Sequence, residues 1–218
     1  MSQPSGDRPP GTFQARPLAP DTWPDLEQLF GLPGGSIVRG CWCMYYRKSG
    51  QQAGGAAGSE NKGALCDLVD SGVVPGLLGY LDGSPAGWIS LGPRADYLKL
   101  RRSPVMKPVD DTPVWSVVCS YVARPYRGQG LQHALLAAAI SFARDSGVRV
   151  LEAYPVDKAE RSQDDFMFFG SRSLYERAGF REVVRRSPTR VVMRRTLRPR
   201  RAHGSGTQRE PGSQPPLP

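Results

Sequence analysis

The segment of this sequence best suited to chemistry is a glycine-rich turn at residues 127–132, Arg-Gly-Gln-Gly-Leu-Gln. It separates a β-branched and aromatic run, typical of a strand buried on both faces, from an apolar pattern that predicts a helix. The first amides of a helix have no internal partner and carry the positive end of the helix dipole, so a phosphate can accept several N–H bonds there. Gly128 and Gly130 have no Cβ to hold an anion away. The turn is a candidate anion site, although two glycines can also serve only to bend the chain.

Two familiar phosphate motifs do not fit this turn. A P-loop would continue with Gly-Lys-Ser or Gly-Lys-Thr, and no such residues follow. A dinucleotide fingerprint would have a third glycine and an acidic residue at the end of the next strand. That glycine is missing, and Glu152 is only the nearest acidic candidate.

Residues 121–131, Tyr-Val-Ala-Arg-Pro-Tyr-Arg-Gly-Gln-Gly-Leu, resemble the cofactor motif of the GNAT superfamily of acetyl-CoA-dependent N-acetyltransferases. Residues 173–180, Ser-Leu-Tyr-Glu-Arg-Ala-Gly-Phe, resemble the second signature of that family. The resemblance extends over about residues 76–197. It implies an α/β fold with a mixed, splayed central β-sheet flanked by helices. It also implies transfer of an acetyl group from acetyl-CoA to a primary amine, by direct attack in a ternary complex.

The same resemblance implies where acetyl-CoA, the cosubstrate, is held. It would enter between the strands at residues 115–122 and 148–153, with its pantetheine arm bonded to backbone groups like an added strand. Gln132 departs from the family, which usually has a small residue there, so its side chain would either crowd the phosphate or donate to it. The expected cofactor-binding residues are Tyr121, Val122, Arg127, Gly128, Gln129, Gly130, Leu131 and Gln132.

The reaction needs a neutral amine and a stabilised leaving thiolate. A lysine-like amine is deprotonated only about once in 2,500 molecules at pH 7, a cost of roughly 4.6 kcal/mol that a base could reduce. Glu152, on the diverging strand, is the first candidate base, with Asp96 or a water relay as alternatives. Tyr175 matches the residue that acts as proton donor to the thiolate in this family. Of the two possible roles, we expect Tyr175 to donate a hydrogen bond to the thiolate rather than to transfer its proton completely. Each residue also has a non-catalytic interpretation. Glu152 could be an ordinary carboxylate on a strand, and Tyr175 could be an aromatic residue of the core.

Residues 41–47, Cys-Trp-Cys-Met-Tyr-Tyr-Arg, are dense in soft and aromatic groups. A zinc site would need further ligands, and the two histidines, His133 and His203, are not at ligand spacing, so we expect no metal. The segment either lines the acceptor site or forms a buried face.

The surrounding pattern predicts helices, a hairpin, a strand, a helix, a strand, a helix and a second hairpin. The central strand-helix-strand unit requires a parallel pair with a right-handed crossover. The predicted helices cover residues 21–32, a second segment containing Leu65 and Leu68, the run closed by Gly147, and residues 171–178. Loops are expected at residues 49–59 and 94–108, and strands at residues 76–80, 86–91, 115–122, 148–153, 180–184 and 191–197.

Length and composition indicate one domain, residues 13–197, between disordered tails at residues 1–12 and 198–218. No secretory or membrane-spanning segment is evident, and the four cysteines are read as reduced thiols, so a cytoplasmic enzyme is expected. The net charge of +9 is concentrated in late arginines, which we interpret mainly as solvated. A small-molecule amine is favoured over a protein acceptor, and a homodimer stays open. The alternatives are a non-catalytic acyl-CoA sensor and, less favoured, a basic nucleic-acid-binding module.

Overall fold

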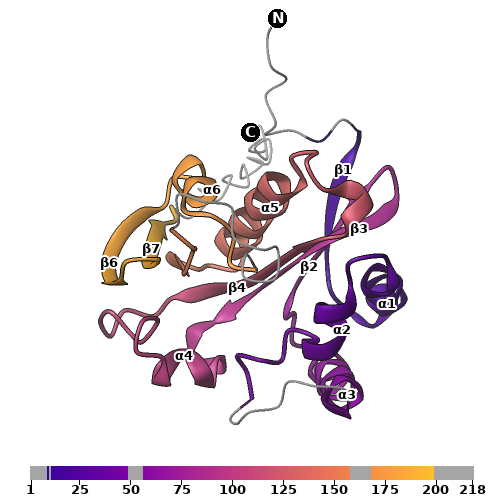
Figure 1. The fold of residues 1–218 in the computed structure, drawn as a ribbon, viewed down its shortest axis with the longest axis horizontal. Helices are drawn as coiled ribbons and strands as arrows, with labels where there is room; N and C mark the ends of the chain where they lie inside the picture. Colours follow the sequence, from indigo (N-terminus) through magenta and orange to yellow (C-terminus); the bar gives the residue numbers. More distant parts are fainter. Residues whose placement is uncertain (1–8, 10, 49–55, 158–167, 199–218) are drawn as a thin grey trace, which may run out of the picture.

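The structure is a computed structural model that describes residues 9, 11–48, 56–157 and 168–198. Its centre is a seven-stranded sheet with the order β1-β2-β3-β4-β5-β7-β6 (Figure 1). The β4–β5 pair is parallel and the other pairs are antiparallel, so the mixed α/β fold is confirmed. The strands are β1 Phe13–Pro17, β2 Gly76–Leu81, β3 Ser84–Pro93, β4 Trp115–Val122, β5 Val150–Ala153, β6 Arg181–Ser187 and β7 Arg190–Thr196. The α-helices are α1 Trp23–Gly31, α2 Ser36–Cys41, α3 Ala56–Asp70, α4 Leu98–Arg102, α5 Leu131–Asp145 and α6 Arg172–Arg177.

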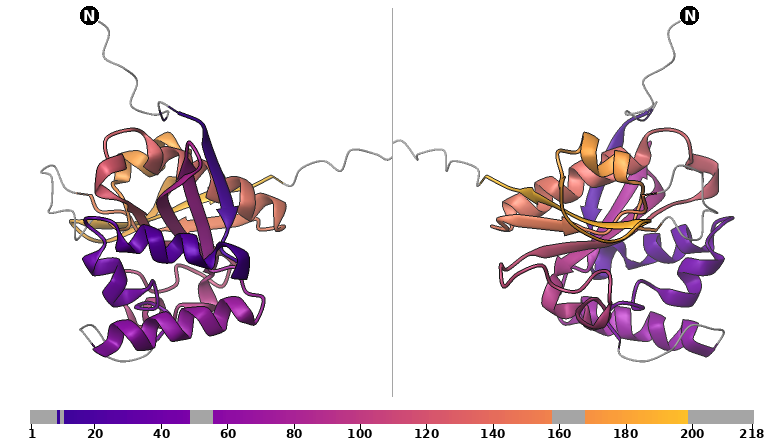
Figure 2. Two further views of the ribbon diagram at one scale, coloured as in Figure 1. Left: turned by 90° about the vertical axis from the view of Figure 1, so that its right-hand side faces the viewer. Right: turned by 60° about the vertical axis from the view of Figure 1, so that its left-hand side comes forward.

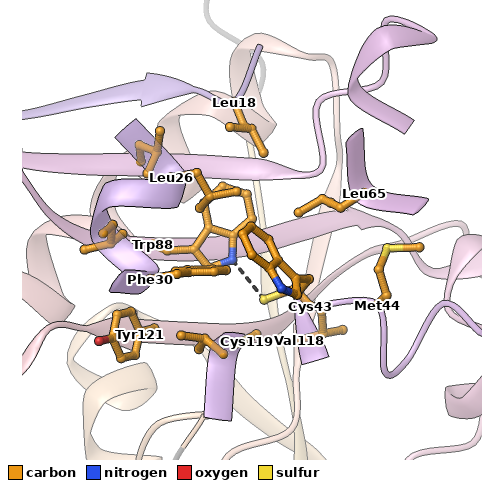
Figure 3. Close-up of a cluster of buried hydrophobic side chains, with 14 of the residues drawn as sticks. Leu18, Leu26, Phe30, Cys43, Met44, Leu65, Trp88, Val118, Cys119 and Tyr121 are labelled. Atoms are coloured by element: carbon orange, nitrogen blue, oxygen red, sulfur yellow. Dashed lines mark hydrogen bonds between the residues drawn. The ribbon is translucent and has the colours of Figure 1, made fainter. Parts of the chain in front are cut away.

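The helices cover the two faces of the sheet separately. Helices α5 and α6 lie on one side, and α1, α2 and α3 lie on the other (Figures 1 and 2). Each side has its own apolar layer, because the pleat sends alternate strand residues to opposite faces. The layer under α5 is built on buried positions at helical spacing: Leu131, Leu135, Leu136, Ala139, Ile140 and Ala143. The layer under α1 to α3 surrounds Trp88 and Phe30 (Figure 3).

The divergence of β4 from β5 is visible in their register. The two strands pair only from Trp115↔Leu151 to Val117↔Ala153, and β4 then continues to Val122 without β5. Val118 is an extra residue relative to β3, because Leu91 pairs with Val117 while Ser90 pairs with Cys119. This bulge changes which side the β4 residues face. Val117 belongs to the α5 layer, whereas Val118 and Cys119 both belong to the layer under α1 to α3.

Most predicted elements are present, and the misses have local causes. The short edge strand β1 contains Pro17 and has no strong alternation, so it was not predicted. The helix α4 was predicted as a loop because its sequence, Leu-Lys-Leu-Arg-Arg, is basic and only one turn long. The predicted loop at residues 49–59 is partly wrong, because α3 already begins at Ala56, and residues 49–55 lie outside the described part of the chain. The predicted tails fall almost wholly outside it too.

The arginines of β6 and β7 are largely engaged with protein groups. Arg185 pairs with Asp157 and Glu182, and Arg194 pairs with Glu152 and Asp110. Arg186 donates to two backbone carbonyls, those of Lys107 and Pro108. The ion pairs of Arg185 and Arg194 neutralise part of the charge that a nucleic-acid surface would need. Within the described ranges, no helix has both the length and the apolar character to cross a membrane.

Candidate active site

The glycine-rich turn has the backbone shape expected of an anion site. Gly128 and Gly130 have φ angles of 75° and 76°, in the left-handed region that glycine adopts without strain. Gly130 is the N-cap of the 15-residue helix α5, and the amides of His133 and Ala134 donate to its carbonyl oxygen. By contrast, no described residue accepts a hydrogen bond from the amides of residues 128–132. A Cβ added at Gly128 would meet no atom within 4 Å, so the space beside this residue is open.

The edge of β4 beyond β5 is partly occupied by the chain itself. The Ser120 amide donates to the Phe168 carbonyl at 2.7 Å, and the Val122 carbonyl accepts from Arg127 Nε at 3.1 Å. Tyr121 lies between Ser120 and Val122 and is opposite Trp88 of β3. Because backbone groups alternate in direction along a strand, Val122 presents its backbone to the diverging edge and Tyr121 presents its own to β3.

The side chain of Gln132 points into the divergence rather than away from it. Its Nε2 donates to Ser120 Oγ at 3.0 Å, so it links the first turn of α5 to β4. Gly170 lies close by with a φ of 74°, and a Cβ there would lie 2.9 Å from Leu174 Cδ2. A glycine at this position therefore lets the segment 168–170 pass between Gln132 and α6.

Tyr175 lies in the same region, on α6. It is buried, with its ring edge-on to Phe180 at 5.1 Å, and its hydroxyl has no hydrogen-bond partner among the described residues. Burial and, secondly, the nearby Cys119 thiol raise the pKa of Tyr175 above its ordinary value. The hydroxyl therefore stays protonated and can donate a hydrogen bond.

Glu152 is fully buried in a network of charged groups. Its Oε1 accepts from Tyr154 at 2.6 Å and from Arg94 at 3.3 Å, and its Oε2 accepts from Arg194 at 2.7 Å. Both carboxylate oxygens are thus engaged, and Glu152 serves as the counter-ion of two guanidinium groups. The alternative base, Asp96, is more exposed and pairs with Arg47 at 3.2 Å.

The cysteine-rich segment 41–47 divides into a buried part and an accessible part. Trp42, Cys43 and Met44 are buried in the layer under α1 to α3, where Cys43 Sγ accepts from Trp88 Nε1 at 3.1 Å (Figure 3). The neighbouring Cys119 thiol and, secondly, burial raise the pKa of Cys43, so it is held as a thiol. The described residues contain no group of ligands suited to a metal ion. Tyr46, in contrast, is only partly buried.

Sequence reasoning missed a cluster of side chains beside the divergence, which we call the arginine–aromatic cluster: Tyr46, Tyr154, Phe169 and Arg190. The rings of Tyr46 and Tyr154 contact Phe169 edge-on at 5.3 and 5.9 Å, and Arg190 lies over the Phe169 ring at 4.9 Å. Phe169 directly follows Phe168, the residue bonded to β4. The available signal in the sequence was Arg190 itself, because it begins a strand that continues with the buried Val191, and a partly buried arginine was therefore predictable there.

Comparisons with known proteins agree with this architecture. Residues 46–180 match the model of a family described as the acetyltransferase (GNAT) family. A GNAT-family acetyltransferase from Streptococcus agalactiae 2603 is similar in structure, with a TM-score of 0.52, 13% identity, and coverage of 85% of this chain and 96% of that one. The protein PH1933 from Pyrococcus horikoshii OT3 has a TM-score of 0.52 and 14% identity, with coverage of 86% and 99%. At these identities the likeness concerns the fold. No curated protein matches the sequence significantly.

Proposed function

Because the chain belongs to the acetyltransferase (GNAT) family, we propose that it moves an acetyl group from acetyl-CoA to a primary amine, by direct attack in a ternary complex. The observation that carries this proposal is the row of amides at residues 128–132, which have no partner among the described residues. This row lies at the start of a long helix and beside a strand that diverges from its parallel neighbour. Such a row of amides suits the diphosphate of acetyl-CoA, because a diphosphate accepts several charge-assisted hydrogen bonds at once.

The residues present fit the cosubstrate. In this proposal, amides of Gly128, Gln129, Gly130, Leu131 and Gln132 hold the diphosphate, whereas the predicted Arg127 amide already donates to the Arg124 carbonyl at 3.4 Å. The Val122 amide would bond the pantetheine arm, whereas the Val122 carbonyl already accepts from Arg127 Nε and would have to exchange that bond. Tyr121 directs its backbone toward β3, so a contribution from it would have to come from its side chain. The buried Tyr121 hydroxyl has no hydrogen-bond partner among the described residues, and its ring would have to move before that hydroxyl could reach a ligand.

Acetyl-CoA supplies the activated acyl group, and the chain supplies orientation and proton placement. Tyr175 would donate its hydroxyl proton as a hydrogen bond to the departing thiolate sulfur, a role that its raised pKa and free hydroxyl support. Glu152 is the predicted base, but its two arginines also give it a structural role. The four cysteines are free in the structure, which agrees with the cytoplasmic location that we propose.

The first experiment is calorimetric titration of the protein with acetyl-CoA at low ionic strength, followed by thiol release across a panel of amines. We expect binding, and thiol release with at least one small amine. In the variant Gln132→Glu, a negative charge at the first turn should repel the diphosphate and weaken binding at least about 10-fold, or roughly 1.4 kcal/mol. An acidic residue at a helix start suits the dipole, so folding should be retained.

The matched control is Gln14→Glu, which places the same charge on the exposed edge strand β1. It should bind acetyl-CoA like the wild type. Absence of any heat with every CoA ester would overturn the proposal. Binding without thiol release across the panel would instead indicate a non-catalytic acyl-CoA sensor.

A further inference from the structure

Arg190 is a partly buried cation that has no anionic partner among the described residues. Its Nη1 donates to the backbone carbonyl of Tyr154 at 2.9 Å, and its guanidinium lies over the Phe169 ring. Three other arginines with largely buried side chains, Arg47, Arg94 and Arg194, each contact a carboxylate. Burial lowers the pKa of Arg190, since desolvation disfavours its charge. An anion bound here would compensate for that desolvation.

The position of Arg190 connects it to the divergence of β4 and β5. Its backbone forms an isolated bridge with Val156, whose amide donates to the Gly170 carbonyl, and two residues earlier the Phe168 carbonyl accepts from Ser120 on β4. Tyr46, Tyr154 and Phe169 belong to the layer under α1 to α3, whereas Tyr175 belongs to the layer under α5. Arg190 and the predicted proton donor therefore flank the divergence from opposite layers of the molecule.

A second cation without a carboxylate lies near the cluster. Lys99 forms no ion pair with any described residue, and its Nζ lies 3.5 Å from the centre of the Tyr45 ring. Its backbone amide donates to the carbonyl of Tyr46, a member of the cluster. The nearby carboxylate of Asp96 is already paired with Arg47. The described charges at this end of the molecule thus leave an excess of positive charge next to aromatic rings.

We propose that Arg190 binds an anionic group of the acceptor, so that the acceptor is a primary amine that also carries a carboxylate or a phosphate. This inference rests on the proposed acetyl transfer and specifies its substrate class. A guanidinium has a planar fork of donors that matches either anion, and the Nε and Nη2 groups of Arg190 are not used by described residues. The rings of Tyr46 and Phe169 would contact the apolar part of the same molecule.

The test uses pairs of amines that differ only in the anionic group. Amino acids are compared with their carboxamides, and phosphoethanolamine with ethanolamine, by kcat/KM for thiol release from acetyl-CoA. The wild type should prefer the anionic member of at least one pair about 10-fold to 100-fold, as expected for a charged hydrogen bond. In Arg190→Gln this preference should disappear, because the anionic amine loses its charged partner while the neutral amine never had one. The favoured pair identifies the anion.

Arg195→Gln is the matched control on the same strand. Arg195 also has no carboxylate partner among the described residues, but it donates to the Ala178 carbonyl at the end of α6. We expect this variant to keep the preference for anionic amines. Circular dichroism and thermal unfolding of both variants establish that they are folded.

A binding measurement separates this inference from the proposed function. The favoured anionic amine should raise the midpoint of thermal unfolding of the wild type without acetyl-CoA, and should not raise that of Arg190→Gln. If this shift occurs without thiol release, the acceptor inference holds and acetyl transfer fails. If neutral amines are acetylated as well as anionic ones, or if no anionic amine binds, the role of Arg190 is refuted.

Discussion

Replacement of Glu152 by glutamine distinguishes a structural carboxylate from a catalytic base. The substitution keeps the size of the side chain but removes the negative charge between Arg94 and Arg194, whose side chains are 10% and 13% exposed. Removal of one partner from a buried ion pair destabilises proteins by about 3–5 kcal/mol, because the remaining charge is left uncompensated. The side-chain NH₂ group of glutamine would also face one of the groups that donate to Glu152, so two donors would meet. We therefore expect a loss of about 3 kcal/mol.

The assay is urea unfolding followed by tryptophan fluorescence, since Trp88 and Trp42 are buried and report on the layer under α1 to α3. In a thermal unfolding experiment, a loss of this size corresponds to a fall in Tm of about 6–12 °C for a domain of this length. Glu176→Gln is the control, because Glu176 contacts Arg172 on the surface of α6 and should matter little.

The opposite result would refute the structural reasoning. If Glu152→Gln unfolds at the wild-type urea concentration while kcat falls and the pH profile loses its acidic limb, Glu152 acts as a base. If stability falls and the residual kcat keeps the wild-type pH profile, the carboxylate serves as a counter-ion, and the base must be sought at Asp96 or in water.

Two further predictions concern single side chains. Tyr175→Phe should leave the free energy of unfolding within about 0.5 kcal/mol of the wild type, because the lost hydroxyl has no partner among the described residues. The value of kcat should fall about 10-fold to 100-fold through loss of the hydrogen bond to the thiolate. A large loss of stability, or an unchanged kcat, would contradict this. Asp157 has a pKa lowered from its ordinary value of 3.8 by hydrogen bonds from Arg185 and Arg172, so its stabilising contribution is fully present above about pH 4 and is lost as the pH falls through the lowered native pKa. Asp157→Asn should therefore lower stability at neutral pH and flatten the acid limb of a stability-against-pH curve, and parallel curves for variant and wild type would contradict the linkage.

Local patterns were sufficient to predict the centre of the fold. The β-branched run of β4 and the apolar stripe of α5 each depend on residues close in sequence, so the parallel strand-helix-strand unit and its glycine turn were predictable. Contacts between distant segments were not. Arg94 and Glu152 are 58 residues apart, and nothing in their local sequences predicts that they meet in the interior. The arginine–aromatic cluster likewise joins the turn after α2, the residue that follows β5, the segment before α6 and the first residue of β7.

The bulge at Val118 makes the active site sensitive to chain length at one point. One additional residue reverses the parity of the strand, so that the side chains of Cys119 and Tyr121 enter one layer while Ser120 reaches Gln132 of α5 in the other. Deletion of a single residue between Val117 and Ser120 would exchange these two sets of side chains, whereas substitution there would preserve them. Among natural variants of this chain, we therefore expect loops to vary in length while β4 varies only in composition.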